Sequence, residues 1–156
     1  MLDNSESIAK WEAIDDFSFD FISAEIQFDF PRLYIRLIDG RTNIDQHQDL
    51  VFRFDRVAAF SMHEEFVHPT QGTVWGREPI ISTKRKSTYP CLIVKGSRWF
   101  ESLRDELEIH YQGAVHYRLC SNFPVVDIVS PEPPLVSWYQ RSPQDQDAKL
   151  TLWAPK

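Results

Sequence analysis

Large apolar side chains occupy every second position through much of the segment from Phe17 to Phe54. A period of two is the side-chain period of a β-strand, because successive side chains point to opposite faces. Each run therefore predicts a strand with one buried face and one solvated face, and together the runs predict an antiparallel sheet with a core of large rings. The runs are Phe17, Phe19, Phe21; Ile26, Phe28, Phe30; Leu33, Ile35, Leu37; and Leu50, Phe52, Phe54.

The alternation changes parity close to the start of the second run. Odd positions are apolar up to Phe21, whereas even positions are apolar from Ala24 onward. One additional residue near Ile22 and Ser23 accounts for the change, because a shift of one residue exchanges the two faces of a strand. We expect either a β-bulge within one long strand or a tight turn between two short strands.

Two segments have helical patterns, and the remaining elements are predicted as strands. A helix is expected at about residues 97–108, where Ser97 is a typical N-cap and apolar residues recur on one side. A shorter helix is expected over Ser5–Asp16, where apolar residues recur at a spacing of three. Further strands are expected at 57–62, 80–83, 91–95, 114–120, 125–130, 135–139 and 149–153.

These elements predict a mainly β (α+β) fold in which one amphipathic helix packs on an antiparallel sheet system. Without an alternation of strands and helices there is no basis for a parallel sheet, so a sandwich or a strongly curved half-barrel is expected. A length of 156 residues fits a single domain over residues 1–156. Residues 1–16 are expected to be a loosely attached N-terminal segment of that domain, because terminal segments often fray.

Composition excludes several classes of protein. The apolar runs are far too short to span a membrane, and the polar first ten residues do not resemble a secretory signal. Two cysteines are too few for a disulfide framework, so we expect free thiols and a cytoplasmic location. The five glycines form no phosphate-binding loop or dinucleotide fingerprint, and no cofactor is predicted.

The negative charge is concentrated at the N-terminal end of the sequence. Residues 1–30 hold eight carboxylates against one lysine, a net charge of −7, whereas the whole chain carries −6. Such a segment repels nucleic acid and attracts a basic protein, although charge runs are also typical of ordinary solvated faces. The predicted partner-binding residues are the acidic Asp15, Asp16, Asp20 and Glu25, with the aromatic anchors Trp75 and Trp138.

One short segment has a superficial likeness to a metalloprotease motif. In His63-Glu64-Glu65-Phe66-Val67-His68 the two histidines are five residues apart, whereas the zinc motif requires four on a helix. A hydrolase or metal enzyme that uses His63, Glu64 and His68 therefore remains an alternative and not the first hypothesis. A barrel that encloses a small apolar ligand is a third possibility, because some curved sheets form such cavities.

Four motifs between residues 89 and 134 carry a resemblance to other proteins. They are Cys91-Leu92-Ile93-Val94, Ser97-Arg98-Trp99-Phe100, His116-Tyr117-Arg118-Leu119 and Val126-Asp127-Ile128-Val129-Ser130. The segment resembles small bacterial proteins of unassigned activity. That resemblance implies a compact antiparallel fold and no functional residues. Some proteins of this kind are encoded near secreted toxins and are suspected immunity proteins. Because the sequence carries no catalytic signature and its first 30 residues are acidic, our first hypothesis is a non-enzymatic protein-interaction module with an acidic face for a basic partner, and an immunity-type inhibitor is one form that it could take.

Overall fold

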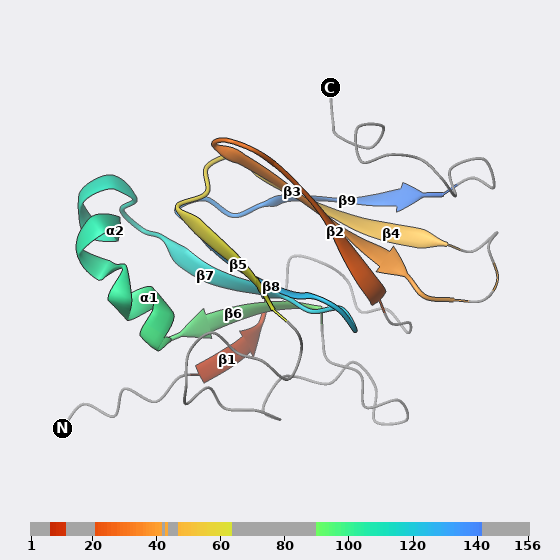
Figure 1. The fold of residues 1–156 in the computed structure, drawn as a ribbon, viewed down its shortest axis with the longest axis horizontal. Coiled ribbons are helices and arrows are strands. Elements are labelled where there is room, and N and C mark those ends of the chain that lie inside the picture. The colour runs from red at the N-terminus through yellow and green to blue at the C-terminus, as the bar shows by residue number, and fades with distance from the viewer. Residues whose placement is uncertain (1–6, 12–20, 42, 44–46, 64–89, 142–156) are drawn as a thin grey trace.

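Two antiparallel sheets form the protein, as the computed structural model shows for residues 7–11, 21–41, 43, 47–63 and 90–141 (Figure 1). The first sheet has the order β1 (Ser7–Lys10), β6 (Cys91–Lys95), β7 (Val115–Leu119), β8 (Val125–Ser130) and β5 (Ala59–His63). The second has the order β2 (Phe21–Asp29), β3 (Arg32–Asp39), β4 (Gln48–Phe54) and β9 (Leu135–Gln140). The predicted mainly β, antiparallel fold is confirmed, and the two sheets do not close into a barrel.

The parity change near Ile22 corresponds to a register shift between β2 and β3. Phe21 pairs with Asp39 and Ser23 pairs with Ile38, so Ile22 is an additional residue on β2. The bulge interpretation is therefore correct, and the alternative of a tight turn is wrong. Because of the bulge, Phe21 and the even-numbered apolar residues after it can both face the core.

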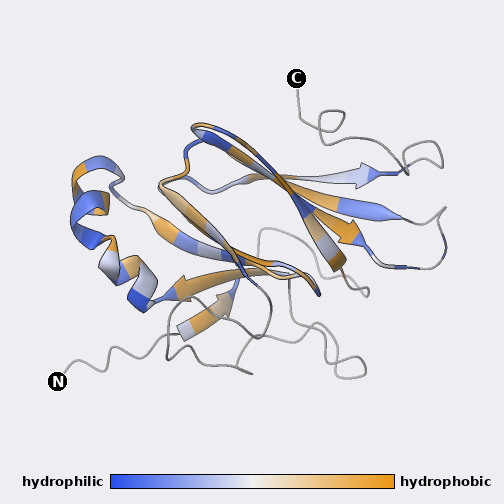
Figure 2. Ribbon diagram, viewed as in Figure 1, coloured by the Kyte–Doolittle hydropathy of each residue, from blue (hydrophilic) through white to orange (hydrophobic). Residues whose placement is uncertain are grey.

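The hydrophobic core lies between the two sheets and contains the alternating residues of β3 and β4. Leu33, Ile35, Leu37, Leu50, Phe52 and Phe54 are all fully buried. The Phe54 ring meets the Tyr117 ring of the first sheet edge to face, with centroids 5.5 Å apart. Figure 2 shows hydrophobic stretches in the strands of both sheets. The period-two pattern thus identified the core-facing residues of β3 and β4.

Two expectations about exposure are wrong. The opposite face of β3 and β4 is not solvated, because Tyr34, Arg36 and Val51 are also buried there. Conversely, Phe28 and Phe30 are exposed at the end of the β2–β3 hairpin, although they continue the alternating run of β2. The backbone of β2 stays paired with β3 as far as Asp29, but the side chains at this end of the hairpin lie outside the hydrophobic core.

The N-terminal helix is wrong over the part that the structure describes. Ser7–Lys10 form strand β1, which pairs with β6 through Ile8 opposite Val94. Trp11 follows with its ring 5.8 Å from the ring of Tyr117 in the core. Pairing with a sheet edge satisfies these backbone groups, whereas a short isolated helix is marginal in water.

The predicted helix at 97–108 is present as two consecutive helices, α1 (Arg98–Ser102) and α2 (Arg104–His110). Ser97 is the N-cap, and its side chain accepts a hydrogen bond of 3.0 Å from the backbone N–H of Phe100. No helix in the described residues is long and apolar enough to cross a membrane. The strands expected at 80–83 and 149–153 lie outside the described residues.

Candidate functional site

A buried carboxylate, Asp127, collects three nitrogen donors in the first sheet. Oδ1 of Asp127 lies 2.6 Å from His116 Nε2 and 2.9 Å from Arg118 Nε, while Oδ2 lies 2.8 Å from His63 Nε2. Strand register produces this arrangement, because Asp127 on β8 is paired with Arg118 on β7 and with Ser61 on β5. His116 and His63 each stand two residues along from those partners, on the same face of the sheet.

The cluster extends from His116 to the start of helix α1. Ser97 Oγ lies 2.9 Å from His116 Nδ1 while it accepts the hydrogen bond from the Phe100 amide. In the tautomer that donates from Nε2 to Asp127, Nδ1 of His116 accepts the hydroxyl proton of Ser97. The hydroxyl therefore uses both its donor and an acceptor site in holding the helix N-terminus against β7.

Serine, histidine and aspartate in sequence along a hydrogen-bonded chain resemble a hydrolytic triad. Ser97, His116 and Asp127 are each no more than 1% exposed, however, and the Trp99 ring packs edge-on against His116 at 5.2 Å. A nucleophile must reach its substrate, and this hydroxyl is both covered and engaged as a helix cap. This hydrogen-bonded cluster is therefore a polar part of the core whose members satisfy one another, and it joins β5, β7, β8 and α1.

Charge and hydrogen bonding hold Asp127 in its ionised form. Burial alone would raise the pKa of this carboxyl, but hydrogen bonds from His116 and His63 and the charge of Arg118 outweigh burial and hold the pKa well below its usual range. Elsewhere in the core, burial raises the pKa of the Cys91 thiol well above its ordinary value, so Cys91 stays protonated and unreactive.

An apolar groove lies beside His63, at the seam between the two sheets. We call it the seam groove; it has a volume of about 490 Å³. Its walls come from β2, from β5 and from the turn between β7 and β8, and its lining residues are Ala24, Ile26, Met62, His63, Phe123 and Pro124. Met62 and Phe123 are each more than half exposed, so the groove is open to solvent.

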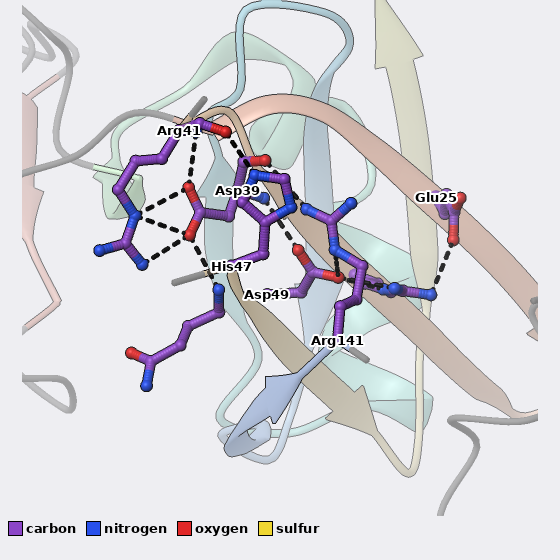
Figure 3. A network of polar contacts seen from close by, with 8 residues as sticks. Glu25, Asp39, Arg41, His47, Asp49 and Arg141 are labelled. Atoms are coloured by element: carbon purple, nitrogen blue, oxygen red, sulfur yellow. Dashed lines mark hydrogen bonds and ion pairs between the residues drawn. The ribbon is translucent and has the colours of Figure 1, made fainter. Parts of the chain in front are cut away.

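A second polar network occupies the end of the second sheet (Figure 3). Asp49 on β4 lies 2.6 Å from Arg36 Nη2 and 2.9 Å from Arg141 Nε, and it accepts the Asp39 amide at 2.9 Å. Asp39 in turn accepts from the side chain of Arg41. Both carboxylates are buried. The network fixes the β3–β4 connection and the end of β9, which is a structural role.

Asp39 is a second carboxylate held in its ionised form. Burial would raise its pKa, but hydrogen bonds from the Arg41 side chain and from the Gln48 and Arg41 amides lower it below the ordinary value. The Gln48 amide donates at 2.8 Å and the Arg41 amide at 2.9 Å. His47 adds a contact between its Nε2 and the Arg41 carbonyl, which ties the two ends of the β3–β4 connection together.

The predicted partner-binding residues are not brought together within the described part of the chain. Glu25 on β2 is 3.5 Å from Arg36 Nη1 and belongs to the ionic network. Trp138 lies on β9, at the opposite edge of the same sheet, and is 44% exposed. The other four, Asp15, Asp16, Asp20 and Trp75, lie outside the described residues.

The alternative enzyme site is likewise only partly described. His63 is held by Asp127, whereas Glu64 and His68 lie outside the described residues. Across the described ranges, no group of three or more His, Cys, Asp or Glu side chains is arranged to hold a metal ion.

Sequence reasoning missed the Asp127 cluster and the seam groove. Both combine residues from distant parts of the chain, such as His63 with Asp127 and Ile26 with Phe123. The sequence did contain a signal for the Asp127 cluster. Asp127 interrupts the apolar strand Val125–Ser130, and a buried charge requires partners. No family model matches the chain, and neither does any curated protein or solved structure.

Proposed function

We propose that this chain is a non-enzymatic protein-interaction module that binds a basic protein partner. The observation that carries the proposal is an exposed apolar surface along the seam between the sheets, which we call the seam patch. It consists of Phe28, Phe30, Met62 and Phe123, with exposed fractions of 47%, 72%, 54% and 55%. Contiguous apolar surface of this kind is typical of interaction sites.

Ring contacts and the seam groove connect the members of the patch. The Phe28 ring lies 6.2 Å from the Phe30 ring and 5.1 Å from that of Phe60 on β5. Met62 and Phe123 both line the seam groove. The patch therefore runs along two strands of different sheets and ends at the β7–β8 turn.

Net charge supports a basic partner. The chain carries −6, and an acidic protein attracts basic proteins over several ångströms before contact. An inhibitor of the immunity type, a role suspected for some of the proteins that residues 89–134 resemble, is one instance of such a module. Its partner would be a toxin domain with a basic surface.

The burial of the serine, histidine and aspartate that resemble catalytic groups favours this proposal over the hydrolase alternative. Ser97, His116 and Asp127 are buried and bonded to one another, and His63 is tied to the same carboxylate. An active site needs such groups open to substrate. The ligand-binding barrel has even less support, because the sheets are not closed.

Affinity capture tests the proposal. The full chain is used as bait in a lysate of its source organism at about 0.1 M and about 1 M salt, where the screening length is about 10 Å and 3 Å. We expect a saturable basic partner, identified by mass spectrometry, whose affinity for the purified chain falls at the higher salt in titration calorimetry. Recovery of no saturable partner at either salt contradicts the proposal.

A further inference from the structure

We draw no further inference here: the strongest candidate, the apolar seam groove between β2, β5 and the β7–β8 turn, carries none because nothing in the part of the chain that the structure describes shows what covers it.

Discussion

Replacement of Asp127 by asparagine is expected to destabilise the protein strongly. The Asp127 carboxylate is fully buried and lies within 2.9 Å of nitrogen atoms on His63, His116 and Arg118. Asp127→Asn removes the negative charge and leaves the Arg118 guanidinium, whose side chain is 4% exposed, without this counter-charge. Loss of one partner of a buried ion pair costs about 3–5 kcal/mol in free energy of unfolding. With a urea m-value of about 2 kcal/mol per molar, the midpoint of unfolding should fall by roughly 2 M.

The same variant should also change how stability depends on pH. The folded pKa of Asp127 lies below its value of about 3.9 in the unfolded chain. Its contribution is therefore present above that value and is lost as the pH falls, because the unfolded state binds the proton first. Wild-type stability should decline below about pH 5, and the decline should be shallower in Asp127→Asn. Asp39, whose pKa is also lowered, retains part of the slope in both proteins.

An exposed carboxylate provides the matched control for these measurements. Asp55 lies 3.0 Å from Arg53 Nε, and its side chain is 41% exposed. Asp55→Asn should cost about 0–1 kcal/mol, as surface ion pairs do. Urea unfolding followed by circular dichroism at pH 7 and at steps down to about pH 3 measures both variants. A loss below about 1 kcal/mol for Asp127→Asn, or an unchanged acid slope, would refute the role assigned to the cluster.

Three further predictions concern other parts of the fold. Asp49→Asn removes the buried negative charge that pairs with Arg36 and should cost about 3–5 kcal/mol in urea unfolding; a cost below about 1 kcal/mol would contradict the role of that charge in the second polar network. Ser97→Ala removes the helix cap and the hydroxyl partner of a buried imidazole, and should cost about 1–2 kcal/mol, whereas the exposed Ser102→Ala should stay within about 0.5 kcal/mol. Equal losses for the two serines would argue against the cap. In thiol labelling of the native protein, partly buried Cys120 should react before fully buried Cys91, and the reverse order would contradict the described burial.

The sequence alone determined which residues form the core-facing side of β3 and β4 and where β2 is irregular. Period-two alternation is a local property, since each side chain of a strand takes its face from the backbone geometry of its neighbours. The strands β6 and β8 could be predicted to the residue, and Ser97 as a helix cap, for the same reason. The N-terminal helix failed because β1 is stabilised by a strand about 85 residues away in the sequence, which local spacing does not reveal.

Only the tertiary structure decided which polar groups meet and where the apolar surface stays open. His63 and Asp127 are 64 residues apart, and Arg36 and Asp49 are 13 apart, so their pairing depends on sheet order and register. The seam groove exists because the outer strands of two sheets lie beside each other without closing into a barrel. Phe28 and Phe30 carry the same alternating signal as Phe52, yet they are exposed, because burial depends on what the opposite sheet covers and not on the strand itself.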